Sequence, residues 1–116
     1  MTVKVILNEQ HTLLENQKEL ISNKFGDQWE FLSVPAAGWN RKEIGEVAKE
    51  LANATVVFAS PIPLLLGTLA HEQGSGHSEG LQVFLLHNDK REKKELPTGK
   101  VISVVAKTGW ELIPIQ

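Results

Sequence analysis

Short apolar runs alternate with longer amphipathic stretches through the first two thirds of the chain. The runs Val3 to Leu7 and Thr55 to Ala59 are nearly all apolar, which is typical of strands buried on both faces of a parallel sheet. Apolar residues recur at helical spacing in three segments: Leu13 to Lys24, Ile44 to Leu51, and Pro63 to about Glu72. With a further strand predicted at Trp29 to Val34, three successive strand and helix units indicate a Rossmann-like α/β fold, a mainly parallel sheet sandwiched by helices.

The last third of the chain has a different pattern. Gln73 to Gly80 is rich in glycine, serine and histidine, and we expect a mobile surface loop there. Three further strands are predicted, at Gln82 to Leu86, Lys100 to Lys107 and Trp110 to Ile115. A charged loop, Asp89 to Glu95, should follow the first of them, and Thr108-Gly109 has the spacing of a hairpin turn between the last two. Residues 1–116 should therefore form a single domain with a C-terminal antiparallel hairpin.

Two predicted helices carry the spacing of a capping box at their first turn. Thr12 is followed three residues later by Glu15, and Asn40 is followed in the same way by Glu43. We therefore expect each helix to begin immediately after its cap, with the preceding turn held in place.

Composition narrows the class of protein. The 116 residues suffice for one compact domain with a buried core. Twelve Lys and Arg against 14 Asp and Glu leave a net charge of -2, which argues against broad contact with duplex nucleic acid. There is no cysteine, so disulfides and thiolate metal sites are excluded. No signal peptide pattern or membrane-length apolar run is present, so we expect a cytoplasmic protein without membrane contact.

Polar side chains follow the first predicted strand directly. Open α/β sheets bind ligands in the crevice outside the carboxyl ends of their strands. We therefore expect Asn8, Gln10 and His11 to contact a ligand at this edge of the sheet. His87, just beyond the fourth predicted strand, should lie at the same edge. Either histidine is equally well explained as a surface or capping residue.

The turn before the third predicted helix lies at this edge as well. Helix N-termini bind phosphates through free N–H groups, which Ser60, Ile62 and Leu64 would supply here. Pro61 and Pro63 have no N–H and would contribute nothing. The alternative is simple capping by Ser60 with proline in the first turn.

Two loops offer further candidate contacts. Lys90 and Arg91 follow the fourth strand, where they could meet a phosphate, although the acidic neighbours make a solvated loop the alternative. The loop of Trp39, Asn40 and Arg41 could present an aromatic face and a guanidinium to a nucleobase. Its alternative is a hydrophobic staple, in which Trp39 packs on the helix that follows.

The third predicted helix is apolar nearly all round, which indicates burial on more than one side. Its apolar residues are Ile62, Leu64, Leu65, Leu66, Leu69 and Ala70. One side could face a second copy in a symmetric homodimer. The alternative is that the C-terminal hairpin folds over that side.

Several common site motifs are absent. No Gly-x-Gly-x-x-Gly turn, Walker-type loop or Gly-x-Ser-x-Gly elbow is present, which disfavours ordinary dinucleotide, ATPase and hydrolase sites. The four histidines show no metal-ligand spacing. We therefore expect neither a metal nor a cofactor.

One longer pattern points to a family. The pattern Leu-Asn/Ser-x-x-His-x-Leu-x-x-x-Gln is matched by Leu7-Asn8, His11, Leu13 and Gln17. With the proline-containing turn at Ser60 and the Ala70-His71-Glu72 helix end, it makes the chain resemble the small stand-alone CRISPR-associated proteins with a CARF-type Rossmann domain. This group includes ring nucleases and cyclic oligoadenylate binders of type III systems. Two departures are Thr12, where the pattern has proline or lysine, and Pro63 in the helix start.

The resemblance implies a symmetric homodimer, open to higher assembly, with one pocket for cyclic tetra-adenylate, the messenger of type III CRISPR defence. Each subunit would present Asn8, His11, Ser60 and Arg91 to half of the ring. The protein would lower the free messenger either by sequestration or by metal-independent cleavage to linear di-adenylate. In cleavage, the ring's 2′-hydroxyl attacks the adjacent phosphorus, His11 acts as acid or base, and Arg91 or Lys90 stabilises the developing charge.

Two other functions stay open from the sequence. The leucine-rich helix could dock a partner protein, which would make the chain an interaction module. The fold could also serve an enzyme that acts on a different nucleotide.

Overall fold

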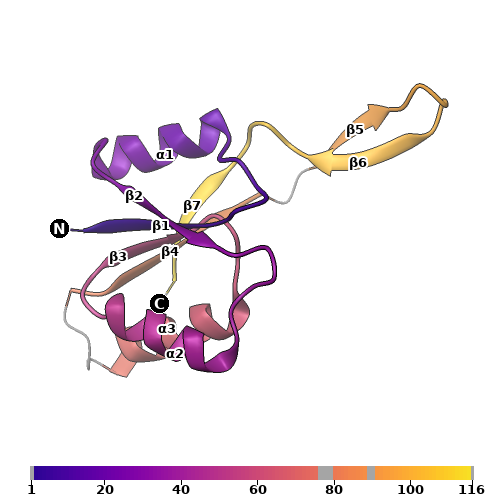
Figure 1. The fold of residues 1–116 in the computed structure, drawn as a ribbon. Coiled ribbons are helices and arrows are strands. Elements are labelled where there is room, and N and C mark those ends of the chain that lie inside the picture. Colours follow the sequence, from indigo (N-terminus) through magenta and orange to yellow (C-terminus); the bar gives the residue numbers. More distant parts are fainter. Residues whose placement is uncertain (1, 76–79, 89–90, 116) are drawn as a thin grey trace.

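The computed structural model describes residues 2–75, 80–88 and 91–115. Strands and helices alternate in the first part of the chain, and strands alone make up the last part (Figure 1). The elements are β1 (Val3–Asn8), α1 (Glu15–Phe25), β2 (Glu30–Val34), α2 (Arg41–Glu50), β3 (Thr55–Phe58), α3 (Pro63–Ser75), β4 (Gln82–His87), β5 (Arg91–Glu95), β6 (Val101–Val105) and β7 (Glu111–Ile115).

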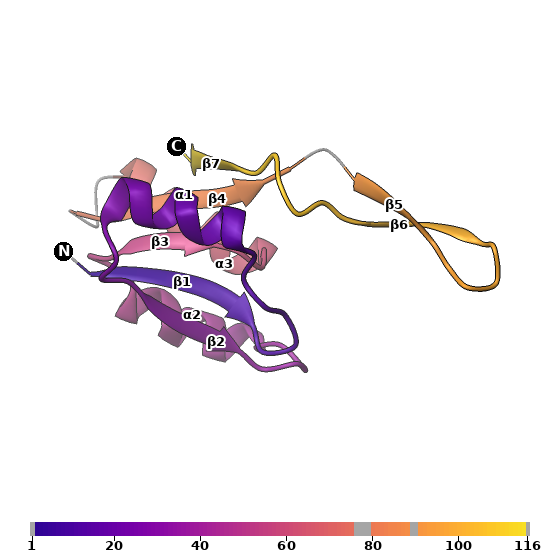
Figure 2. The ribbon, with the colours of Figure 1, turned by 90° about the horizontal axis from the view of Figure 1, so that it is seen from above.

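A five-stranded sheet in the order β2-β1-β3-β4-β7 forms the centre of the fold. The first four strands of this order run parallel, and β7 pairs antiparallel with β4. Helix α1 covers one face of the sheet, whereas α2 and α3 cover the other (Figure 2). The predicted Rossmann-like α/β class is therefore confirmed.

Side chains alternate between the two faces along the central strands. On β1, Val5 packs with Ile21 on the α1 side, whereas Ile6 packs with Leu65 on the α2 and α3 side. All four residues of β3 are buried. A sheet with a core on both faces needs nearly all-apolar strands, which explains the runs seen in the sequence.

The predicted capping box of α2 is confirmed. The Asn40 side-chain oxygen accepts a hydrogen bond from the Glu43 backbone N–H at 2.8 Å, and the Glu43 carboxylate accepts one from the Asn40 backbone N–H at 3.1 Å. Both donors would otherwise lack a partner at the helix start. Ile44, one position further on, is buried and holds this end of the helix on the sheet.

Replacing Asn40 by alanine should lower the free energy of unfolding by about 1 kcal/mol, because the Glu43 N–H loses its acceptor. Urea denaturation followed by circular dichroism measures this loss. Asn23→Ala is the matched control, since Asn23 lies exposed within α1 and alanine favours a helix there. Equal destabilisation by both changes would show that the cap contributes nothing.

The predicted capping box of α1, Thr12 with Glu15, is wrong. The helix begins at Glu15 itself, and the residue before it, Leu14, is extended, with a ψ of 154°. Leu13 is buried against Val5 and Ile21 within the core on the α1 side. The chain stays extended through this point, so that Leu13 reaches the core before the helix starts.

The predicted hairpin between residues 100–107 and 110–115 is also wrong. β7 pairs with β4, with Glu111 opposite His87 and Ile115 opposite Val83. The Thr108-Gly109 segment does not reverse the chain onto β6 but leads it to the main sheet, where the Asn88 side-chain amide donates to the Thr108 carbonyl at 2.8 Å. Pairing with β4 lets alternate β7 side chains pack against the cores of both faces.

The antiparallel hairpin of the fold is formed instead by β5 and β6. Its turn is closed by hydrogen bonds between Leu96 and Lys100 and between Gly99 and Leu96, with Gly99 at a φ of 83° that favours glycine. The segment Arg91 to Glu95 is thus an exposed strand rather than the predicted loop. The hairpin extends away from the main sheet as an arm (Figures 1 and 2).

Helix α3 is buried on one side. Leu65 and Leu69 are fully buried, but the side chain of Leu64 is 51% exposed. The alternative in which the C-terminal hairpin covers this helix is wrong, because that hairpin does not form: β7 joins the main sheet, and β6 belongs to the arm, which projects away from α3 (Figure 1). Residues 73–75 of the predicted loop belong to the helix, and residues 76–79 lie outside the described residues.

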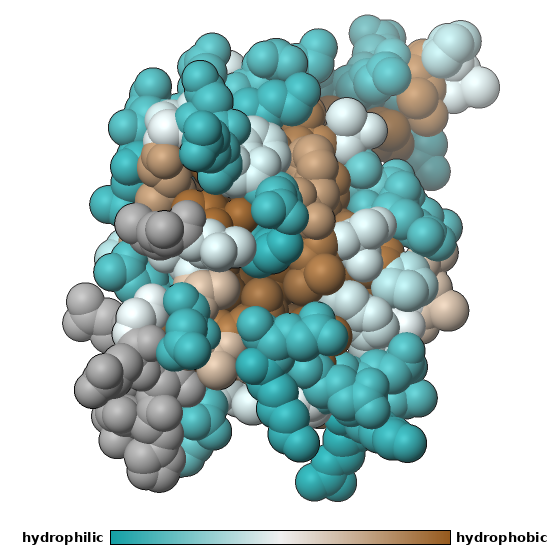
Figure 3. Space-filling model, turned by 60° about the vertical axis from the view of Figure 1, so that its left-hand side comes forward, coloured by the Kyte–Doolittle hydropathy of each residue, from teal (hydrophilic) through white to brown (hydrophobic). Residues whose placement is uncertain are grey.

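Apolar side chains reach the surface between the helical layers. Figure 3 shows them as a band between the hydrophilic outer surfaces of the molecule. Phe31 of the edge strand β2 is 50% exposed and contacts the ring of Trp29 edge to face.

In the described part of the chain, none of the helices has both the length and the apolar character that crossing a membrane requires.

Candidate functional site

A cleft of about 690 Å³ opens at the carboxyl ends of β1 and β3. These neighbouring strands are connected in opposite directions, β1 to β2 on one side and β3 to β4 on the other, so the cleft lies at the switch point of the sheet. Its lining residues are Leu7, Asn8, Gln10, His11, Thr12, Leu14, Gln17, Ala59, Ser60, Pro61, Arg91 and Trp110. The crevice predicted from the sequence is therefore present.

Ser60 joins the two strand ends at the floor of the cleft. Its backbone N–H donates to the Ile6 carbonyl at 2.9 Å, and its side-chain oxygen accepts the Asn8 N–H at 2.9 Å. The His11 ring Nδ1 is 3.4 Å from the same oxygen, at the long end for a hydrogen bond. Because Ser60 is buried and its oxygen already accepts one bond, its own proton can point toward His11.

The turn after β1 is held by its own backbone. Asn8 accepts the Gln10 N–H through its side-chain oxygen and the His11 N–H through its carbonyl, both at 2.9 Å. Glu9 points elsewhere, because its carboxylate accepts the Ala36 N–H at 2.8 Å. The polar groups of the turn are thus positioned before any ligand binds.

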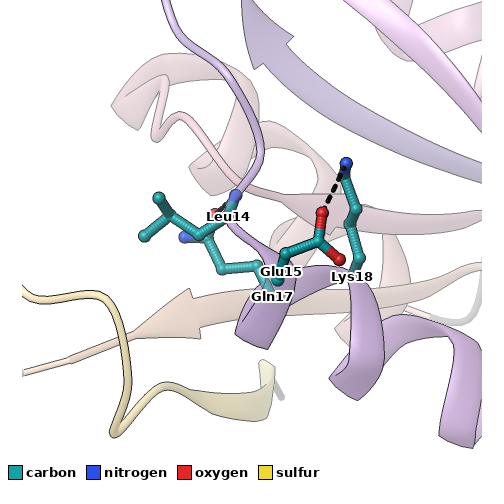
Figure 4. A network of polar contacts seen from close by, with 4 residues as sticks. All are labelled: Leu14, Glu15, Gln17 and Lys18. Carbon is teal, nitrogen blue, oxygen red and sulfur yellow. Dashed lines mark hydrogen bonds and ion pairs between the residues drawn. The ribbon is translucent and has the colours of Figure 1, made fainter.

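The start of α1 forms a second wall. The side-chain oxygen of Gln17 accepts the Leu14 backbone N–H at 2.9 Å, which supplies the cap that Thr12 was expected to provide. Figure 4 shows Gln17 reaching back to Leu14, while the ion pair of Glu15 and Lys18 lies on another side of the helix. Gln17 is only 6% exposed although its side chain carries an amide.

Trp110 closes the cleft on the side of the C-terminal segment. Its backbone N–H donates to the Asn16 side chain at 3.1 Å, and its indole N–H donates to the Ala106 carbonyl at 2.9 Å. Both polar groups are therefore satisfied, and the ring is fixed beside the start of α1. The sequence pattern predicts Trp110 only as the first residue of a strand.

The electrostatics of the cleft favour a negatively charged ligand. Arg91, the first residue of β5, is the single fully charged side chain among the described lining residues, and no carboxylate belongs to that set. The guanidinium group can donate two parallel hydrogen bonds to a phosphate.

Five of the predicted ligand contacts meet in this cleft: Asn8, Gln10, His11, Ser60 and Arg91. Others do not line it. Trp39 packs against the core that contains Ile44, as the staple interpretation expects, and the Asn40 side chain caps α2.

The remaining candidates lie around the cleft or beyond it. The Ile62 carbonyl accepts the Leu66 N–H at 2.8 Å, which places Pro63 at the first position of α3, and neither Ile62 nor Leu64 lines the cleft. His87 is the last residue of β4, opposite Glu111 of β7. Lys90 lies outside the described residues.

Neither known proteins nor a metal-binding cluster in the described part of the chain identifies a ligand for the cleft. No family model, curated protein or solved structure matches this chain. Within the described residues, no group of three or more His, Cys, Asp or Glu side chains gathers in a way that could hold a metal ion.

Proposed function

We propose that this chain binds cyclic tetra-adenylate in the cleft between β1, β3 and α1 and lowers the free level of that messenger. The observation that carries the proposal is a preformed cleft at the switch point that holds Arg91 and Trp110 and no carboxylate among its described lining residues. Arginine suits a phosphate, and an indole face suits a nucleobase. The match of residues 7–17 to the CARF-type pattern supports the choice of a cyclic oligoadenylate.

The proposal includes a symmetric homodimer. A volume of about 690 Å³ falls within the ~300–1,000 Å³ that enclose a drug-sized ligand, and a ring of four nucleotides is considerably larger. Two copies related by a two-fold axis would each bind half of the ring, which has matching symmetry. Light scattering during gel filtration should therefore give the mass of a dimer, and a monomer that stays monomeric with the ring bound would contradict this part.

Sequestration is the version that the cleft supports better. Cleavage requires the 2′-oxygen to attack phosphorus and lose its proton to a base while the bond to the 5′-oxygen breaks and that oxygen gains a proton. His11 is the one side chain among the described lining residues of a type that commonly serves as general acid or base. A second acid or base, which efficient transfer would use, is not among them. We therefore propose a binding protein that retains the ring intact.

The deciding experiment incubates excess protein with labelled cyclic tetra-adenylate. A native gel reads binding, and chromatography after denaturation reads cleavage. We expect a shifted complex from which the ring is recovered intact. Recovery of linear di-adenylate would instead identify a ring nuclease, and a ring that neither shifts nor changes would overturn the proposal.

A further inference from the structure

The side-chain NH₂ group of Gln17 has no hydrogen-bond acceptor within the described part of the chain. Its side-chain oxygen is engaged by the Leu14 N–H at 2.9 Å, which fixes which end of the amide is the NH₂ group. The side chain is 6% exposed and lines the cleft. Among the described residues, the structure gives its NH₂ group no acceptor. A buried donor without a partner costs free energy, so an acceptor supplied by a ligand would relieve that cost.

Trp110 lies at the same end of the cleft. Its backbone N–H is bound to Asn16, the residue directly before Gln17, at 3.1 Å. The indole N–H is used by Ala106, so the ring offers a ligand its apolar surface rather than a donor. An aromatic surface beside an unused NH₂ group suits a flat heterocycle that carries an acceptor atom.

The part of the cleft at the strand ends has a different character. Asn8, His11 and Ser60 gather at the strand ends with hydroxyl, amide and imidazole groups. Arg91 lines the cleft as well and pairs with Val105, next to Ala106, whose carbonyl accepts the Trp110 indole N–H. The groups at the strand ends suit phosphate and sugar oxygens, and Arg91 suits a phosphate of the same nucleotide, which leaves the end with Gln17 and Trp110 for the base.

We propose that this end is a base subsite, in which an adenine stacks on Trp110 and one of its ring nitrogens accepts a hydrogen bond from the Gln17 NH₂ group. This inference rests on the proposed binding of cyclic tetra-adenylate and names the contact that reads the base. Gln17 is thus a specificity-determining residue as well as the cap of α1.

The test measures the affinity of the protein for cyclic tetra-adenylate and for three analogues in which N1, N3 or N7 of each adenine is replaced by C–H. One analogue should bind the wild-type protein at least tenfold more weakly, because the Gln17 donor then faces a carbon. The same analogue and the parent ring should bind Gln17→Met equally, since methionine has a similar length and no donor. Trp110→Leu should weaken all four rings about tenfold or more.

The outcomes separate this inference from the function on which it rests. If wild-type protein binds none of the rings, the proposed function fails. If it binds all four equally, or if the selective loss persists in Gln17→Met, the function stands and the Gln17 contact is wrong. Should Gln17→Met fold poorly through loss of the Leu14 cap, the wild-type series alone decides, because equal binding of all four rings overturns the contact.

Discussion

Replacing Phe58 by alanine is expected to lower the free energy of unfolding by about 3–5 kcal/mol. Phe58 is fully buried at the end of β3, in the core shared with Ile6 and Leu65. The change removes a large apolar side chain and leaves a cavity that packed strands and helices cannot close. The loss is a large share of the ~5–15 kcal/mol that typically keeps a domain folded.

Denaturation in urea, with tryptophan fluorescence as the signal, measures this loss. Phe31→Ala serves as the control, since Phe31 is half exposed and its contact with Trp29 contributes about 1 kcal/mol. Phe58 also lies directly before the cleft residues Ala59 and Ser60, whose backbone N–H groups both donate to the Ile6 carbonyl. A Phe58 variant no less stable than the Phe31 variant would show that the core is packed differently from the description above.

The second large effect concerns binding. Arg91→Ala should weaken the affinity for cyclic tetra-adenylate roughly 10- to 100-fold, because a hydrogen-bonded charge pair contributes about 1.5–3 kcal/mol. Arg91→Lys should recover only part of the loss, since an ammonium group cannot pair with a phosphate through two parallel bonds. Titration of labelled ring with each variant, at one fixed salt concentration, provides the measurement.

Lys93→Ala is the matched control for this prediction. It removes the same charge from the same strand, but Lys93 is exposed on the arm and does not line the cleft. Its effect should stay within about twofold, because exposed charges are screened by salt. Equal losses in the Arg91 and Lys93 variants would indicate general attraction to the arm rather than a contact in the cleft.

A double replacement of His11 and Arg91 that changes neither affinity nor turnover would show that the ring does not bind in the cleft.

The parallel half of the fold could be predicted because its signals are local. Buried parallel strands need apolar runs, and Asn40 with Glu43 marks the start of α2 within four residues. The pairing of β7 could not be predicted in the same way. Thr108-Gly109 has the same composition whether the chain turns back on β6 or continues to pair with β4. Only the packing of β7 against both cores decides.

The residues of the candidate site likewise fall into those that could be predicted from local signals and those that could not. Asn8, His11 and Ser60 were predictable because the ends of parallel strands meet at one edge of a sheet. Trp110 reaches the cleft only because β7 joins the main sheet. Gln17 lines it because α1 begins at Glu15, two residues later than predicted, which puts Gln17 in the first turn. Trp110 thus depends on contacts between distant segments, whereas Gln17 belongs to the pattern matched at residues 7–17 but its place in the cleft follows only from where the helix starts.

The direction of β7 has a practical consequence. β1 starts with Val3 opposite Thr55, and β7 ends with Ile115 opposite Val83, so both ends of the described chain lie where the parallel strands begin. The cleft lies where those strands finish. A fluorophore, an affinity handle or a sensor surface attached at either end would therefore leave the cleft facing solution.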